Sequence, residues 1–136
     1  AETLREALLR LFDCSPPQST QFVGLLQCVA DGVRAMHESG FLHNDLGNQN
    51  VLLRPESPER WRDFMVVDLN RGRVRASLGL RQRGRDLSRI ELPSDLLQIL
   101  IEMYWRGVPP QELLMRAVAA QGAGFVYCVA RRATPA

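Results

Sequence analysis

The chain has 136 residues, of which 46% are apolar and 24% are charged, and its formal net charge is +2. This length corresponds to one domain with a single core, and the composition excludes a largely disordered chain. All 17 basic residues are arginines. Any role that requires a lysine must therefore be filled from outside this chain.

The three cysteines, Cys14, Cys28 and Cys128, show no C-x-x-C spacing, and neither histidine lies near one of them. This pattern gives little support to a metal centre with cysteine ligands and favours free, buried thiols in a reducing compartment. The apolar stretches are too short to cross a bilayer, and no signal segment is recognised. We expect a cytoplasmic protein, with peripheral contact at the inner face of the cytoplasmic membrane as an alternative.

The N-terminal part of the chain is predicted to be helical. Leucines and Phe12 recur at helical spacing over residues 2–12, and Ser15-Pro16-Pro17 ends that helix. A second helix, capped by Ser19 or Thr20, has apolar residues at steps of three and four and ends at Gly40. These apolar residues are Phe22, Leu25, Leu26, Val29, Val33 and Met36.

Short strands and loops are predicted after Gly40. A polar loop over 43–50 precedes an apolar strand over 51–53, and a turn-rich linker over 54–59 leads to a second strand over 64–67. The two strands are predicted to pair as a hairpin. Residues 70–90 are rich in arginine and glycine and are expected to be mainly loop.

The C-terminal part is again predicted to be helical, with a helical core over 94–121. Residues 95–106 are apolar almost all round, which is typical of a helix buried in a core. Pro109-Pro110 opens a further helix to about Ala120, and residues 125–129 form a short strand or an extended tail. The expected fold class is α+β, mainly α-helical with a small β-hairpin.

The most informative motif has the spacing H-x-D-x-x-x-x-N and comprises His43, Asp45 and Asn50. It follows an amphipathic helix and precedes a short strand, which is the context of a kinase catalytic loop. The second strand ends in Asp68, in the metal-binding region 68–70, where kinases carry the aspartate of D-F-G. The order of helix, loop, strand, linker and strand-final aspartate resembles the C-terminal lobe of a protein-kinase-like fold.

Phosphoryl transfer accounts for these residue types. The attacking hydroxyl must be oriented and its proton accepted, which assigns the Asp45 carboxylate as the base. Mg²⁺ on the phosphates of ATP prefers hard oxygen ligands and keeps several waters, so Asn50 and Asp68 suffice to hold the metal and the nucleotide. His43 belongs to the catalytic loop, and we expect it to pack underneath and hydrogen-bond the backbone. Asp86 is expected to anchor the same backbone from the helical core.

The motifs differ from those of regulated eukaryotic protein kinases. Position 44 is Asn instead of Arg, Asp68 is followed by Leu-Asn, and Ala-Pro-Glu is absent. Residues 68–73, 84–90 and 101–107 resemble the bacterial lipopolysaccharide kinase family, the Kdo and heptose kinases, and the resemblance covers roughly 19–107. It implies an ATP- and Mg²⁺-dependent kinase that phosphorylates a sugar hydroxyl of an anionic glycolipid in lipopolysaccharide biosynthesis.

Seven arginines fall within residues 71–89, where a kinase holds its activation segment. Guanidinium groups bind phosphate and carboxylate in a bidentate manner, so we expect an anionic acceptor. The candidate substrate-binding residues are Arg71, Arg73, Arg81, Arg83 and Arg85. A solvated surface is the alternative for each single arginine, and nucleic acid is not expected because no aromatic residues interleave with them.

Two alternatives remain open. Aminoglycoside and choline phosphotransferases share the loop motif, although they carry a long helical insertion near it. The Gly-rich loop and the lysine of a kinase N-terminal lobe do not occur in residues 1–136. We therefore expect a fragment, a C-terminal lobe inactive by itself that relies on an N-terminal lobe from the same gene or a separate chain. A natural C-terminal lobe that binds without catalysis is the second alternative.

Overall fold

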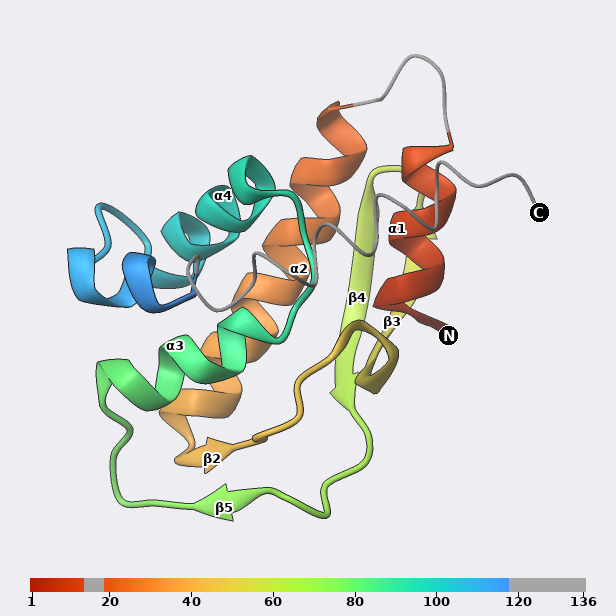
Figure 1. Cartoon of the computed structure of the whole chain (residues 1–136). Helices are drawn as coiled ribbons and strands as arrows, with labels where there is room; N and C mark the ends of the chain where they lie inside the picture. Colours follow the sequence, from red (N-terminus) through yellow and green to blue (C-terminus); the bar gives the residue numbers. More distant parts are fainter. Residues whose placement is uncertain (14–18, 118–136) are drawn as a thin grey trace, which may run out of the picture.

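The computed structural model describes residues 1–13 and 19–117, and its elements are arranged around one long helix, α2 (Ser19–Glu38) (Figure 1). On one side of α2 lie α3 (Leu80–Ser88) and α4 (Ser94–Trp105). On the other side lie α1 (Leu4–Phe12) and a hairpin of β3 (Val51–Ser57) and β4 (Arg60–Val66). The α+β fold class predicted from the sequence is confirmed.

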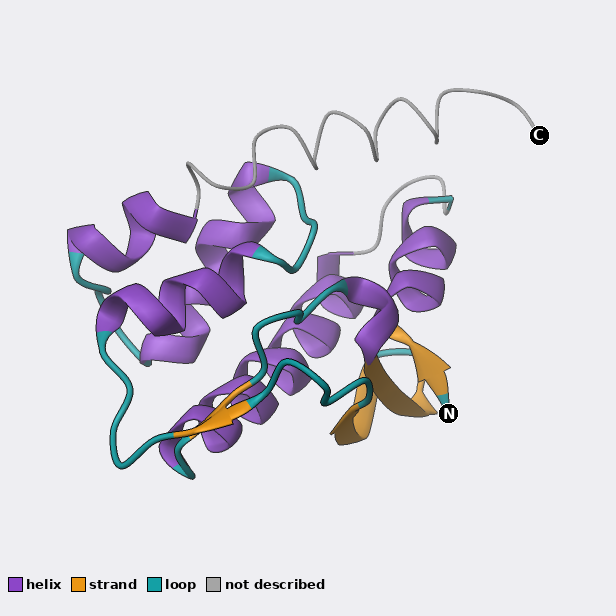
Figure 2. Cartoon of the chain, turned by 60° about the horizontal axis from the view of Figure 1, so that its bottom comes forward, coloured by secondary structure: helices purple, strands orange, loops and turns teal. Residues whose placement is uncertain are grey.

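The strands form two small antiparallel sheets (Figure 2). In the first, β1 (Glu2–Thr3) pairs with β3 and β3 pairs with β4. In the second, β2 (Phe41–Leu42) pairs with β5 (Arg73–Val74). The second sheet therefore joins the strand that enters the polar loop to the strand that follows Asp68.

The start of α1 shows why the helix begins where it does. Thr3 Oγ1 accepts a hydrogen bond from the backbone N–H of Glu6 at 3.1 Å, and the Glu6 carboxylate accepts one from the backbone N–H of Thr3 at 3.4 Å. This reciprocal capping satisfies two N–H groups that a helix start leaves without partners. The helix predicted over 2–12 is confirmed, except that its first two residues form β1.

The β3–β4 hairpin lies close to α2 because two glycines of the helix leave room for it. A Cβ atom at Gly24 would come within 1.9 Å of the Glu59 carbonyl oxygen, and one at Gly32 within 2.1 Å of the Phe64 ring. The two glycines lie about two turns apart and share one helix face. A larger residue at Gly24 would displace the Glu59 backbone just before β4, and one at Gly32 would displace the Phe64 ring.

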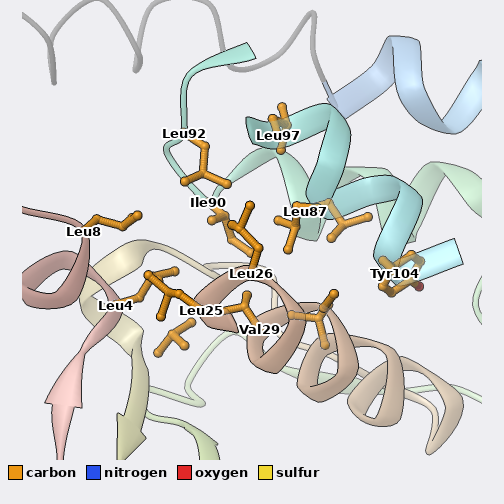
Figure 3. Close-up of a cluster of buried hydrophobic side chains, with 14 of the residues drawn as sticks. Leu4, Leu8, Leu25, Leu26, Val29, Leu87, Ile90, Leu92, Leu97 and Tyr104 are labelled. Atoms are coloured by element: carbon orange, nitrogen blue, oxygen red, sulfur yellow. The ribbon is translucent and has the colours of Figure 1, made fainter. Parts of the chain in front are cut away.

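A neighbouring face of α2 carries the apolar stripe predicted from the sequence, and it forms the centre of the core (Figure 3). Each fully buried aliphatic side chain of this kind contributes about 1.5–3 kcal/mol relative to an exposed one. Residues of α1 and α4 and of the segment after α3 pack around the stripe. The completely or almost completely buried members include Leu4, Leu25, Leu26, Val29, Leu87, Ile90, Leu97, Leu100, Ile101 and Tyr104.

Two expectations for loops were wrong. The linker over 54–59 is mostly strand, because β3 continues through Ser57 and β4 begins at Arg60. Pro55 does not break β3, since that part of the strand is exposed and irregular in register, which is where sheets tolerate proline. The segment over 70–90 contains β5 and the helix α3, whose start is capped by Gln82 Oε1 accepting from the Gly79 N–H at 3.0 Å.

The helix predicted over 95–106 is present as α4 and belongs to the core, as expected from its apolar residues, but it is not buried on all sides. Only one face, which carries Leu97, Leu100, Ile101 and Tyr104, is buried. Ile99 on the opposite side is 38% exposed. Residues 111–117 are helical, as predicted for the segment after Pro109-Pro110, while the continuation to Ala120 and the segment 125–129 lie outside the described residues.

Cys28 is a half-buried free thiol, and burial, with the nearby Asp31 and Asp63 charges, raises its pKa to about 11. Cys14 and Cys128 lie outside the described residues. Within residues 1–13 and 19–117, no helix has the length and apolar character needed to cross a bilayer.

Glu2 ties β1 to α1 and β4, and its charge should support the fold in a pH-dependent way. Its Oε1 accepts from Trp61 Nε1 at 2.9 Å and from Arg10 Nη2 at 3.0 Å. Burial alone would raise the pKa of Glu2, but these hydrogen bonds and the Arg10 charge outweigh it and lower the pKa. A carboxylate with a lowered folded-state pKa stabilises the fold above its unfolded pKa, and this stability is lost as the pH falls through the folded pKa.

We therefore expect Glu2→Gln to lower the free energy of unfolding by about 1 kcal/mol at pH 7, because the charged acceptor is lost. Urea unfolding at pH 7 and in acid measures this difference, which should disappear below the lowered pKa of Glu2. Glu56→Gln, an exposed change in the same sheet, is the control. A difference that persists in acid would contradict the assigned role of the charge.

Candidate active site

The polar loop between β2 and β3 is built over the buried ring of His43. The backbone N–H of Asp45 donates to His43 Nδ1 at 3.1 Å, so this nitrogen is an acceptor. His43 Nε2 must then carry the proton, and it donates to the Val67 carbonyl oxygen at 2.8 Å. With both ring nitrogens engaged, His43 has no free position for general-base chemistry. It lies under the loop, where the sequence led us to expect it.

Asn50 connects the loop to the end of β4. Its side chain is buried, and its Nδ2 donates to the Asp45 carbonyl oxygen at 2.9 Å. The Asn50 backbone oxygen accepts from the Val67 N–H at 2.9 Å. Because Nδ2 faces the loop interior, Oδ1 is the atom of this amide that remains to face a cation.

Asp68 follows immediately after Val67, whose N–H and carbonyl oxygen are bound by Asn50 and His43. Its φ is +59°, and the φ of Asn44, inside the loop, is +68°. Left-handed backbone at a non-glycine residue costs about 1–2 kcal/mol and persists only where the surroundings impose it. Asp63 and Arg106, away from this loop, also have positive φ, and Asp and Asn adopt this region more readily than most residues.

Asp86 on α3 fixes the start of the loop. Its carboxylate is completely buried, with Oδ2 accepting from the His43 N–H and Oδ1 from the Asn44 N–H, each at 2.9 Å. The prediction that Asp86 anchors the loop backbone from the helical core is confirmed. His37 Nε2 also lies 2.9 Å from Asp86 Oδ2.

Two supports of the loop were missed by sequence reasoning. His37 is buried on α2, one helical turn after Val33, and its position on the apolar stripe is the signal that could have found it. Asn48 binds the segment between α3 and α4, since its Oδ1 accepts from the Glu91 N–H at 2.9 Å and its Nδ2 donates to the Glu91 carbonyl oxygen at 3.0 Å. No local sequence pattern indicated this pairing.

The donor set at the site fits a hard metal ion that is only partly held by protein. Asn50 and Asp68 offer an amide oxygen and a carboxylate. Within the described ranges, no group of three or more His, Cys, Asp or Glu side chains is placed to hold a metal ion. Two oxygen ligands suit Mg²⁺, which keeps waters and binds substrate phosphates, and they do not suit zinc.

A groove of about 670 Å³ lies beside the loop and is strongly basic. It is lined by Asn44, Asn70, Arg71, Arg73, Arg85, Ser88 and Arg89. Asn44 links the groove to the loop, because its Nδ2 donates to the Arg71 carbonyl oxygen at 2.9 Å. None of the lining residues carries a carboxylate.

The structure thus brings together three of the five candidate substrate arginines, Arg71, Arg73 and Arg85, and adds Arg89. Arg81 is exposed and does not line the groove. Arg83 does not line it either. Its Nε donates to the Leu78 carbonyl oxygen at 3.0 Å and its Nη1 to the Tyr104 hydroxyl at 2.9 Å.

Two comparisons with known proteins found a match. The solved structure described as "WaaP in complex with acyl carrier protein" shares the fold, with a TM-score of 0.64 and 24% sequence identity. The match covers 98% of this chain and 59% of that chain, so this chain spans about three-fifths of that structure. No match to a curated protein was found. The sequence model of the lipopolysaccharide kinase (Kdo/WaaP) family matches residues 10–106, and the chain therefore belongs to that family, as its motifs predicted.

Proposed function

We propose that this chain carries the catalytic loop, metal ligands and acceptor groove of an ATP-dependent kinase that phosphorylates a sugar hydroxyl of an anionic glycolipid. Membership of the lipopolysaccharide kinase family supports kinase chemistry. The observation that carries the proposal is the hydrogen-bonded link from His43 and Asn50 to Val67, the residue before Asp68. In this proposal, the link supports the relative placement of Asp45, Asn50 and Asp68.

Asp45 is the proposed base. Its N–H is bound by His43 Nδ1 at 3.1 Å, and its carbonyl oxygen accepts from Asn50 Nδ2 at 2.9 Å and from the Gly47 N–H at 2.8 Å. None of the hydrogen bonds found in the described part of the chain uses its carboxylate. A fixed backbone with an unoccupied, half-buried carboxylate can orient an attacking hydroxyl and accept its proton.

Asn50 and Asp68 are the proposed ligands of Mg²⁺ and, through it, of ATP. When bound, the metal neutralises charge on the nucleotide phosphates. The role of the chain is to present the two oxygens, one from the buried Asn50 and one from Asp68, two residues after the end of β4. The lysine and Gly-rich loop that complete a kinase site belong, in this proposal, to an N-terminal lobe outside residues 1–136.

The basic groove is the proposed binding site for the acceptor. Its four arginines, Arg71, Arg73, Arg85 and Arg89, lie beside Asn44, the residue before Asp45. Guanidinium groups bind phosphates and carboxylates in a bidentate manner, and the groove has no carboxylate of its own to compete. An acceptor that carries such groups near its reactive hydroxyl would therefore be held next to the base.

Removal of either proposed carboxylate should slow phosphate transfer, with different effects on nucleotide binding. In the complete gene product, Asp45→Asn should lower kcat by about 10²–10⁴-fold with little change in nucleotide affinity, because only the base is lost. Asp68→Asn should also weaken binding of Mg²⁺–ATP. Phosphate transfer and nucleotide titration measure the two effects, and Asp31→Asn on the exposed face of α2 is the matched control. Near-normal kcat in Asp45→Asn would refute the assignment.

Removing the positive charges of the groove should weaken binding of the acceptor and leave binding of the nucleotide unchanged. With Arg71, Arg85 and Arg89 changed to Gln, the KM for a purified lipopolysaccharide acceptor should rise about tenfold or more, while the KM for nucleotide stays unchanged. The effect should shrink as salt is added, because exposed charges are screened over about 8–10 Å.

The control for this experiment removes the same number of charges elsewhere, at Arg5, Arg60 and Arg81, which are exposed and do not line the groove. If both triple variants behave alike, the effect is one of net charge. If the acceptor KM of the groove variant is unchanged at low salt, the groove is not the acceptor site and the roles of Asp45 and Asp68 are unaffected.

A further inference from the structure

A buried chain of polar side chains runs from α3 and α4 to the catalytic loop. Arg83 Nη1 lies 2.9 Å from the Tyr104 hydroxyl, which lies 2.7 Å from His37 Nδ1. His37 Nε2 in turn lies 2.9 Å from Asp86 Oδ2, and the same oxygen holds the His43 N–H. Tyr104 and His37 are each 1% exposed, and Asp86 is fully buried. In Figure 3 the Tyr104 side chain reaches from α4 toward α2.

The chemistry of these groups fixes the direction of each hydrogen bond. Asp86 is an acceptor, so His37 Nε2 must carry a proton toward it, since an unprotonated nitrogen would face the oxygen with its lone pair. Arg83 can only donate, so the Tyr104 oxygen accepts from it. Within the described residues, His37 Nδ1 is the one acceptor in contact with the Tyr104 hydroxyl, so Tyr104 donates to it and the ring proton of His37 lies on Nε2.

The surroundings of Tyr104 keep it a donor. Burial raises the pKa of the Tyr104 hydroxyl, and the Arg83 hydrogen bond and the Arg83 and Arg34 charges only partly oppose this rise. Arg34 Nη1 also binds the Tyr104 carbonyl oxygen at 2.9 Å. The ring is further held edge-on to His37, with centroids 5.6 Å apart. Both the hydroxyl and the ring of Tyr104 are therefore fixed against His37.

We propose that Tyr104 is a positioning residue for the transfer reaction: its hydroxyl, supported by Arg83, holds His37 in the tautomer that orients the Asp86 carboxylate under the catalytic loop. Asp45 lies one residue beyond Asn44, whose N–H the same carboxylate holds at 2.9 Å. A rotated or mispaired carboxylate would displace the backbone that carries the base. This inference rests on the proposed function only for its kinetic consequence, because the tautomer and the loop geometry can be measured without turnover.

The test uses Tyr104→Phe, which keeps the packed ring and removes only the hydroxyl. In the complete gene product, kcat should fall about tenfold because the base is displaced. The KM for nucleotide and the KM for the acceptor should stay within about twofold of their values in the unchanged protein. Long-range ¹H–¹⁵N correlation should show His37 as Nε2–H in the unchanged protein and as a mixture of states in the variant. Amide hydrogen exchange at His43 and Asn44 should become about tenfold faster.

Leu97→Val is the matched control, because it also perturbs the buried face of α4 but touches none of these polar groups. It should lower the free energy of unfolding without changing the His37 tautomer or the kcat of the folded protein. Exchange at the His43 and Asn44 amides should rise only as much as the loss of global stability accounts for. If Tyr104→Phe does not fold, Arg83→Met provides the second variant, since it removes the donor behind the Tyr104 hydroxyl.

The outcomes separate the two proposals. An unchanged His37 tautomer, or unchanged exchange at His43 and Asn44 beyond that of Leu97→Val, would overturn the positioning role. A shifted tautomer with faster exchange but unaltered kcat would also overturn it, because the loop would then tolerate the change. If the unchanged protein transfers no phosphate to any acceptor, the proposed function fails, and the tautomer and exchange measurements still decide whether Tyr104 positions the loop.

Discussion

The buried carboxylate of Asp86 is the constraint on which the rest of the structure depends. Burying a charge costs several kcal/mol unless hydrogen bonds compensate it, and Asp86 has no guanidinium or ammonium partner. It is compensated by His37 at the end of α2 and by two backbone N–H groups of the loop. The position of α3 is therefore fixed relative to α2 and to residues 43–44, and any shift of one part would leave the charge unsatisfied.

Given that anchor, the remaining geometry of the site follows from the backbone. The loop is held at its start by Asp86 and further along by Asn48, which binds Glu91. Between these points Asn50 and His43 reach across to Val67, so the end of β4 cannot move independently. The left-handed conformation of Asp68 is tolerated because the peptide before it is bound on both sides. The hydrogen bonds that Val67 makes with Asn50 and His43 therefore hold Asp68 in its left-handed conformation.

The sequence predicted the parts of this arrangement that have a local signal. The periodicity of α2, the hairpin and the spacing of His43, Asp45 and Asn50 are such signals. The helix α3 was missed because only Leu80 and Leu87 among its nine residues are apolar aliphatic, and its buried Asp86 counts as polar in any periodicity. The role of Arg83 could not be predicted, since composition does not say to which side of a helix a guanidinium points.

The direction of the side chains on α3 explains how one short, arginine-rich helix can serve two purposes. Arg85 and Arg89 are four residues apart and line the basic groove. Arg83 and Asp86 are three residues apart and reach the buried polar chain between α2 and α4. The arginines of this segment therefore have two different places: Arg85 and Arg89 line the groove, and Arg83 belongs to the polar chain that supports the loop. Because Arg85 lies on α3 and Arg89 at its C-terminal end, the Asp86 contacts that fix α3 also fix this side of the groove relative to the Asp45 loop.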